Sequence, residues 1–248
     1  FGNNGSGKTN ILEGISLLSK GRGLRNSAYS NLINKNQNNF FIKSLINIDD
    51  IEYNIDIYTE NRDDKLKKII KVNNDASKDS INLLNSLISF LIFVPEMERM
   101  FLSSPNTRRN FIDRLIYSYD NTYNAIINKY KKNIIEGNKI LQNNQFDLNW
   151  INHIEYEISK LGLQIYNLRK DQIIILNKYI YELNSCNKYP FKIKLDIRDT
   201  FFSNQKDIDS YLGSLKENRD YDRKFGGTKF GPHKSDIFAN INNEFNAS

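Results

Sequence analysis

Cysteine and histidine are scarce in this sequence, which has one cysteine, Cys186, and two histidines in 248 residues. A single cysteine excludes a disulfide framework within the chain and is typical of proteins in the reducing cytosol. The histidines, His153 and His233, lie far apart in sequence and suggest no metal site. No Cys-x-x-Cys, His-Glu-x-x-His or Gly-x-Ser-x-Gly motif occurs. We therefore expect a cytoplasmic protein.

Long apolar runs are also missing, and none approaches the roughly 18 residues of a membrane helix. We therefore expect no membrane partner. Lys and Arg outnumber Asp and Glu by 35 to 29, and the net charge of +6 is compatible with a nucleic-acid partner without pointing to one. A hydrophobic share of 39% and a length of 248 residues are ordinary for one or two soluble globular domains.

The sequence opens with the pattern G-x-x-x-x-G-K-T, which is typical of a phosphate-binding loop. Its glycines let successive backbone N–H groups point at phosphate oxygens, and the following helix directs its positive end at the same spot. Lys8 is expected to contact the β- and γ-phosphates, and the Thr9 hydroxyl to bind Mg²⁺. The predicted nucleotide-binding residues are Gly2, Asn3, Asn4, Gly5, Ser6, Gly7, Lys8 and Thr9. A chance glycine-rich turn is the alternative.

Such a loop normally follows a buried strand, and no residues for that strand precede Phe1. We therefore expect Phe1 to be a cut edge. After the loop, Ile11, Leu12, Ile15 and Leu18 have helical spacing and predict a helix over residues 7–19. Residues 40–72 alternate as an antiparallel meander, and a short helix near 80–87 and a buried strand over 89–94 are expected next.

Residues 104–184 have a helical pattern. Ser104 and Pro105 form a start signal, and one or two helices are expected from there to about residue 143. A heptad seam over residues 148–184 predicts a long helix. It comprises Ile151, Ile154, Ile158, Leu161, Ile165, Leu168, Gln172, Ile175 and Tyr179. An antiparallel helical hairpin or arm, or else a compact helical lobe, is expected. A strand over 191–197, a polar helix near 205–218 and a glycine-rich turn into a strand over 226–241 follow.

Three segments together resemble the RecF recombination-mediator ATPases, a branch of the ABC/SMC-type ATPases. After the loop and its helix, Gly21, Arg22 and Arg25 match the family's Gly-Arg-x-x-Arg. The segment VPEMERMFLSSPNTRRNFIDRLI at residues 94–116 is similar to the family's Pro-Glu segment and Arg-Arg-x-Phe-Leu-Asp helix. The segment GPHKSDI at residues 231–237 is similar to its Gly-Pro-His segment. The resemblance covers essentially the whole chain.

The resemblance implies an α/β fold, a P-loop ABC-type ATPase head with a mixed sheet and antiparallel meander, plus an α-helical lobe or hairpin. Residues 1–95 would form the N-terminal part of the head, 96–189 the helical lobe or arm, and 190–248 a return to the head. It also implies a DNA-binding protein of recombinational repair, replication-gap processing and the SOS response. Its cofactors would be ATP and Mg²⁺. ATP would drive homodimerisation on single-stranded, gapped or junction DNA, where the protein helps recombination-mediator partners to load.

The ABC signature, the Walker B strand and the D-loop of the family are not found in this sequence. The full-length dimer is expected to be a weak ATPase, whereas this chain alone presents half a site and is not expected to be catalytic. An SMC-like structural or tethering ATPase and an inactive truncated fragment are the alternatives. A small-molecule P-loop kinase is disfavoured, because such kinases continue with βαβ units rather than a meander.

Five further residues are singled out. Arg22 and Arg25 are candidate nucleotide or trans-subunit contacts, and Arg25 is the preferred one. The alternative is that they lie on the solvated surface. Arg108 and Arg109 are candidate DNA-phosphate contacts, but structural pairing with Asp113 or Asp120 is at least as well supported. His233 is expected to be a hydrogen-bonded structural residue rather than a nucleotide contact.

Overall fold

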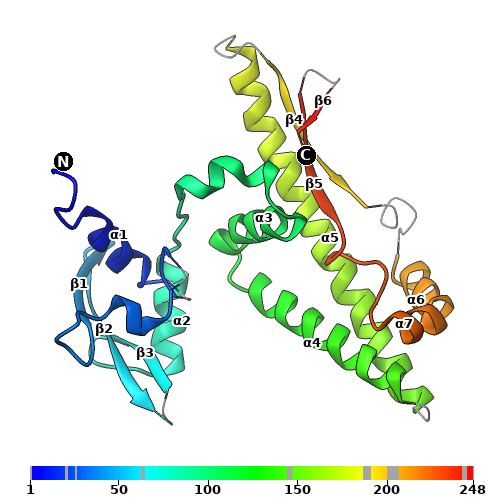
Figure 1. The fold of residues 1–248 in the computed structure, drawn as a ribbon, viewed down its shortest axis with the longest axis horizontal. Helices are drawn as coiled ribbons and strands as arrows, with labels where there is room; N and C mark the ends of the chain where they lie inside the picture. Colours follow the sequence, from blue (N-terminus) through cyan, green and yellow to red (C-terminus); the bar gives the residue numbers. More distant parts are fainter. Residues whose placement is uncertain are drawn as a thin grey trace. The chain divides into compact units, whose positions relative to one another are not determined.

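The computed structural model describes residues 2–19, 22–25, 27–62, 65–143, 147–186, 191–199, 207–241 and 245–247. The chain divides into two compact units, Phe1–Val94 and Pro95–Ser248 (Figure 1). Each unit has its own hydrophobic cluster and is described by itself.

The first unit is a three-stranded antiparallel sheet with helices beside it. In chain order its elements are α1 (Lys8–Ser16), the 3-10 turn η1 (Tyr29–Leu32), β1 (Phe41–Ile48), β2 (Ile51–Arg62), β3 (Lys65–Val72) and α2 (Lys78–Leu87). The strands pair in the order β1-β2-β3, so the predicted meander is confirmed. Asp49 and Asp50 make the two-residue turn between β1 and β2, and both have positive φ, as a tight hairpin turn requires.

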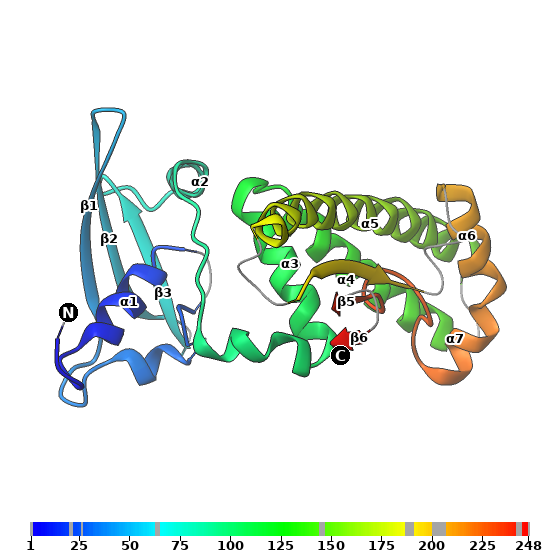
Figure 2. The same cartoon turned by 90° about the horizontal axis from the view of Figure 1, so that it is seen from above.

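The core of the first unit lies on one face of this sheet. Ile55 and Ile57 on β2 are fully buried and alternate with more exposed residues, as expected for a sheet with one covered face. Leu17 and Leu18 follow α1 and pack into the same cluster as Leu84 of α2. Both helices therefore contribute to the same side of the sheet (Figure 2).

The buried strand predicted over residues 89–94 is wrong. These residues form no strand, and Leu91 and Phe93 are 43% and 65% exposed. A β-branched and aromatic run becomes a strand only when a neighbouring strand completes its backbone hydrogen bonds. Neither described sheet includes a strand paired with this segment.

The second unit is mainly helical. Its helices are η2 (Pro95–Leu102), α3 (Pro105–Tyr119), α4 (Tyr123–Gln142), α5 (Leu148–Ser185), α6 (Ile208–Glu217) and α7 (Arg219–Phe225). The predicted start signal of α3 is confirmed, because the Ser104 hydroxyl accepts the Thr107 amide and Pro105 occupies the first turn. Helix α7 was not predicted. None of the described helices is both long and apolar enough to span a membrane.

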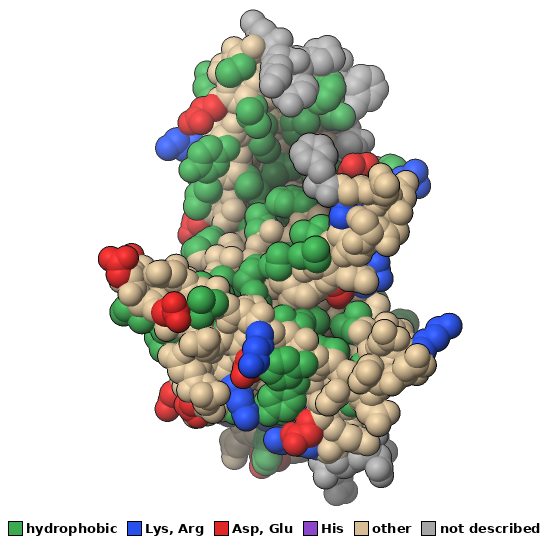
Figure 3. Space-filling model, turned by 90° about the vertical axis from the view of Figure 1, so that its left-hand side faces the viewer, with side chains coloured by type: hydrophobic (Ala, Val, Ile, Leu, Met, Phe, Trp, Pro, Cys, Tyr) green, Lys and Arg blue, Asp and Glu red, His purple; other side chains and the backbone are tan. Residues whose placement is uncertain are grey.

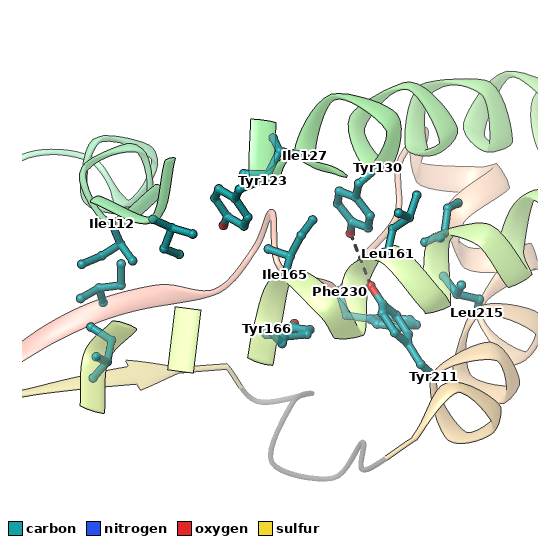
Figure 4. Packing of buried hydrophobic residues seen from close by; sticks show 14 of the residues in the cluster. Ile112, Tyr123, Ile127, Tyr130, Leu161, Ile165, Tyr166, Tyr211, Leu215 and Phe230 are labelled. Atoms are coloured by element: carbon teal, nitrogen blue, oxygen red, sulfur yellow. Dashed lines mark hydrogen bonds between the residues drawn. The ribbon is translucent and has the colours of Figure 1, made fainter. Parts of the chain in front are cut away.

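Helices α4 and α5 pack side by side in opposite directions. Gly137 of α4 lies against Ile154 and Ile158 of α5, where even a Cβ atom would contact both side chains at 3.4 and 3.6 Å. The predicted seam of α5 is buried from Ile151 to Ile165, but Tyr179 is 58% exposed. Figure 4 shows Leu161 and Ile165 among side chains from α4 and α6, together with Phe230. This packing is that of a compact helical lobe over most of the seam.

A second antiparallel sheet completes this unit, in the order β4-β5-β6. Its strands are β4 (Ile193–Arg198), β5 (Asp236–Ile241) and β6 (Phe245–Ala247). The edge of β4 is completed by side chains of α5. The Asn177 amide both donates to the Leu195 carbonyl and accepts its N–H, each at 2.8 Å, and Asn184 does the same for Ile193. These amides replace the neighbouring strand that an exposed edge would otherwise recruit.

Candidate nucleotide-binding site

Residues 2–9, here called the phosphate loop, form a turn that leads directly into α1. Gly5 and Gly7 both have φ of 85°, in the left-handed region that favours glycine. The Ser6 amide donates to the Asn3 carbonyl at 3.2 Å, which closes the turn, and Gly7 is the N-cap of the helix. The helix predicted after the loop is confirmed, although it ends at Ser16 rather than near residue 19.

The N-terminus of α1 is electrostatically open. No side chain caps it, and its first turn contains no acidic residue. The partial positive charge of the helix end is therefore not offset from within the helix. Lys8 and Thr9 are both exposed at this end. The arrangement suits an anion that approaches along the helix axis.

The Lys8 side chain turns back over its own loop. Its ammonium donates to the Gly2 carbonyl and, at 3.2 Å, to the Asn3 carbonyl. Both acceptors are neutral and the side chain is exposed, so these bonds are weaker than bonds to an ionised oxygen would be. A phosphate group placed over the helix end would be the stronger partner for this ammonium.

The segment with Arg22 and Arg25 is held on the side of α1. The Ser16 hydroxyl accepts the Leu24 amide at 2.7 Å, and the buried Glu13 carboxylate lies 4.0 Å from the Arg25 Nε atom. Gly23 has φ of 82°, and a Cβ atom there would stand 2.3 Å from a Glu13 carboxylate oxygen. Arg25 is thus placed beside the second turn of α1. Its contact with a nucleotide stays a prediction, and Gly21 lies outside the described residues.

Lys68 of β3 anchors the other end of α1. Its ammonium donates to the carbonyls of Leu17 and Ser19 at 3.0 and 2.8 Å, just after the last turn of the helix, where carbonyls have no helical partner. Burial lowers the pKa of Lys68 to about 8. Sequence reasoning missed Lys68, Glu13 and Ser16. The sequence offered one sign, and only for Lys68: this lysine occupies a position of the strand where the alternation predicts an inward-facing side chain.

The apolar stripe used to predict α1 is largely uncovered. Ile11, Leu12 and Ile15 are 66%, 57% and 46% exposed, whereas Leu17 and Leu18 are buried. Figure 3 shows hydrophobic side chains exposed on the surface of the molecule in that view. The spacing therefore predicted the helix, but no described residue of the first unit covers this side of it.

Arg108, a candidate DNA contact, is buried in the second unit. Its Nε and Nη2 atoms bind both carboxylate oxygens of Asp236 at 2.8 and 2.7 Å, and Nη1 binds the carbonyls of Phe101 and Ser103. Hydrogen bonds to Asp236 raise the pKa of Arg108. Four of its five N–H donors are engaged. Structural pairing was the alternative considered for this residue, but the partner is neither Asp113 nor Asp120.

Arg109 has a different environment. It is half-buried, and its Nη1 atom donates to the Ser235 carbonyl at 2.6 Å. Burial and then the nearby Arg169 guanidinium lower its pKa. No carboxylate among the described residues forms an ion pair with it. Its role as a DNA contact stays a prediction.

His233 belongs to residues 231–235, here called the Gly-Pro-His turn. Its Nδ1 atom lies 2.8 Å from the Tyr130 hydroxyl, and its Nε2 atom lies 3.4 Å from the Thr228 carbonyl. Since a carbonyl can only accept, Nε2 carries the proton and Nδ1 accepts from Tyr130. Burial lowers the pKa of His233 to about 4, so the ring is neutral at pH 7. This is the hydrogen-bonded structural histidine that the sequence favoured.

Arg169 was missed by sequence reasoning, although it holds this turn to the helices. It is buried on α5, pairs with both carboxylate oxygens of Asp113 at 2.8 and 2.9 Å, and donates to the Pro232 carbonyl at 2.5 Å. The Tyr123 hydroxyl donates to the same Asp113 at 2.7 Å. Its position next to the seam residue Leu168 offered no local sign that a charge would be buried.

Comparison with known proteins was made by sequence and by structure. No family model matches the chain. The DNA replication and repair protein RecF of Rickettsia typhi is 35% identical over 239 residues, which cover 95% of this chain and 65% of that protein. RecF of Rickettsia bellii strain OSU 85-389 is 31% identical over 241 residues, covering 96% and 65%. The chain thus spans about 65% of the length of these relatives.

Two solved structures share the fold. One, described as the recombination mediator protein RecF with ATP in the RecFOR pathway, has a TM-score of 0.83, 23% identity, and coverage of 100% of this chain and 67% of its own. Another RecF structure has a TM-score of 0.81 at 24% identity, with coverage of 98% and 66%. RecF is an ABC-type ATPase, so the predicted fold class is confirmed. By sequence the chain is RecF-like over part of the RecF length, and the two solved structures show that it shares the RecF fold.

Proposed function

We propose that this chain holds ATP at its phosphate loop, as part of a RecF-type protein of DNA replication and repair. The observation that carries the proposal is the geometry of residues 2–9. Two glycines at positive φ lead into a helix that has neither a capping side chain nor an acidic first turn. The relatives are described as DNA replication and repair proteins, and one structural neighbour as RecF with ATP.

Each side chain of the loop would have one task. The Lys8 ammonium would exchange the carbonyls of Gly2 and Asn3 for β- and γ-phosphate oxygens. The exposed Thr9 hydroxyl would bind Mg²⁺, which supplies neutralising charge beside the phosphates. Mg²⁺ usually takes most of its ligands from phosphates and water rather than from a protein cage. This fits the described residues, which contain no group of three or more His, Cys, Asp or Glu able to hold a metal.

The remaining steps concern the whole protein. In an ABC-type ATPase the nucleotide is sandwiched between the phosphate loop of one subunit and the signature of another. We therefore propose that ATP promotes homodimerisation on single-stranded, gapped or junction DNA. There the protein would help recombination proteins to load during repair and the SOS response. Support comes from the RecF likeness and from the net charge of +6.

The tethering alternative gains no support from α5. Its seam is buried from Ile151 to Ile165 against α4 and other parts of the second unit. A tether would instead need a long helical arm that reaches beyond such packing. The lobe is better explained as a compact domain in which buried ion pairs hold the Gly-Pro-His turn against the helices.

The test is ATP binding by Lys8→Ala, measured with a fluorescent ATP analogue and Mg²⁺. Removing the ammonium should weaken binding by at least about tenfold, because a charge-assisted hydrogen bond contributes about 1.5–3 kcal/mol. Lys35→Ala removes an exposed lysine of the same unit outside the loop and should bind as the unchanged chain does. Equal affinity in Lys8→Ala and Lys35→Ala would rule out the site, and no ATP binding by the unchanged chain would favour an inactive fragment.

A further inference from the structure

A small pocket lies in the second unit, between α3, α4, α5 and the Gly-Pro-His turn. It encloses about 50 Å³. This exceeds the ~15 Å³ that one water molecule needs, and it is far too small for a whole nucleotide. The side chains that matter at its wall are Arg109 and Asp113 of α3, Lys131 of α4, Arg169 of α5 and His233 of the turn.

The charges around the pocket do not balance. Arg169 is paired with Asp113, and Arg108 behind the wall is paired with Asp236. Arg109 is the third arginine of this group, and it has a carbonyl partner but no carboxylate partner in the described part of the chain. Asp236 and Asp113 attract the Arg109 guanidinium from a distance, but each carboxylate is hydrogen-bonded to another arginine. Half-burial also leaves the Arg109 guanidinium only partly hydrated. The wall therefore has an excess of positive charge.

The remaining lining groups add donors and no further negative charge. Lys131 is exposed on α4 at the rim. Asn106 and Asn110 lie three residues before and one residue after Arg109 on α3, and both line the pocket. His233 is neutral, since burial lowers its pKa. Asp113, the one acidic side chain at the wall, already accepts from Arg169 and Tyr123.

We propose that this pocket binds a single phosphoryl group between Arg109 and Lys131. A guanidinium fork and an ammonium, flanked by amides, form a donor set that suits the oxygens of a phosphate. The group could be a free phosphate anion or one phosphodiester of a nucleic-acid strand. Only the strand source rests on the proposed function, and neither source involves the phosphate loop.

The test uses the Lys8→Ala chain as its background, so that phosphate binding at the phosphate loop contributes little. Two probes are titrated by calorimetry at matched ionic strength: inorganic phosphate, and a short single-stranded oligothymidylate. The variants are Arg109→Gln, Arg109→Lys and Lys131→Gln. Lys132→Gln is the matched control, since it removes the same charge from the next residue of α4, which does not line the pocket.

We expect at least one probe to bind about tenfold more weakly to Arg109→Gln and to Lys131→Gln, with Lys132→Gln unchanged and Arg109→Lys partly restored. A loss seen with phosphate alone assigns a free anion, and a loss that includes oligothymidylate assigns a strand. Should Arg109→Gln fail to fold by circular dichroism, the exposed Lys131→Gln still decides. Equal binding to Lys131→Gln and Lys132→Gln, or no binding of either probe to the background chain, overturns the proposal.

Discussion

The phosphate loop and the Gly-Pro-His turn are both short, glycine-containing segments that precede a regular element, yet their polar groups have opposite fates. In the phosphate loop, Lys8 is exposed, and within the described part of the chain its ammonium donates to carbonyls of its own loop. In the Gly-Pro-His turn, Arg169 binds the Pro232 carbonyl and Arg109 binds the Ser235 carbonyl. The first segment leaves its lysine ammonium exposed to solvent, whereas the groups of the second join elements that are distant in sequence.

The largest effect is expected from breaking the turn's main anchor, with Arg169→Met. This change leaves the partly buried Asp113 carboxylate without its cation and removes a donor from the Pro232 carbonyl. Removing one partner of a buried ion pair costs about 3–5 kcal/mol. The single tryptophan, Trp150, lies on α5, so urea unfolding followed by its fluorescence reports on the second unit. A loss below about 1 kcal/mol would show that the pair does not hold the turn.

The next comparison places alanine at a glycine of each segment. Gly231 has φ of 127°, and a Cβ atom there would stand 2.5 Å from the hydroxyls of both Tyr130 and Tyr211. Gly5 has φ of 85°, but nothing lies within 4 Å of its added Cβ atom. Gly231→Ala should cost about 3 kcal/mol from strain and overpacking together, and Gly5→Ala about 1 kcal/mol from backbone strain alone.

Thermal melting by circular dichroism measures both glycine variants. Because the two positions lie in different units, each melt is compared with the unchanged chain rather than with the other variant. The proposed difference between the phosphate loop and the Gly-Pro-His turn is wrong if Gly5→Ala lowers the melting temperature as much as Gly231→Ala does. Such a result would mean that the phosphate loop is packed as tightly as the turn.

A smaller effect depends on pH and involves His233. Burial lowers its folded pKa to about 4, below the unfolded value of about 6.5, so the unfolded chain binds more protons between these values. Stability from this residue is present above pH 6.5 and is lost as pH falls toward 4. Between pH 7 and pH 5 the unchanged chain should lose about 1–2 kcal/mol more than His233→Gln.

The variant is needed because Asp222 acts in the opposite direction. Burial raises the pKa of Asp222 to about 6, so its contribution to stability increases as pH falls from 6. Asp222 is present in both chains and cancels in the difference. Urea unfolding of both at the two pH values measures the remaining effect, and parallel losses would remove His233 as its source.

Local features of both segments could be predicted from sequence, because they depend on neighbouring residues. The loop pattern, the Ser104 cap and the meander are of this kind. The burial of Arg108 was not predictable, since Asp236 lies 128 residues away in sequence. Arg108 and Arg109 are adjacent, and each helical residue is turned by about 100° from the last. The helix therefore points one side chain inward and leaves the other at a pocket, a difference that no local pattern encodes.

The exposed stripe of α1 has a related cause. Its spacing correctly predicted a helix, but a stripe is buried only where other elements supply a surface, and the described part of the first unit supplies none for Ile11, Leu12 and Ile15. For the same reason, residues 89–94 have a strand-like composition and form no strand. In both cases the composition gives a tendency, toward burial for the stripe and toward strand formation for residues 89–94. Whether the segment follows that tendency depends on the neighbouring elements.

The smallest expected effect is that of Lys8→Ala on stability. The Lys8 ammonium is exposed, and among the described residues it donates to the carbonyls of Gly2 and Asn3, which are themselves exposed, so its removal leaves neither of them buried and unpaired. Surface substitutions of this kind usually change stability by about 0.5 kcal/mol or less. Thermal melting without nucleotide should therefore match the unchanged chain, even though ATP binding is weakened. A clear drop in melting temperature would mean that Lys8 is a structural residue, and the contrast with Arg169 would disappear.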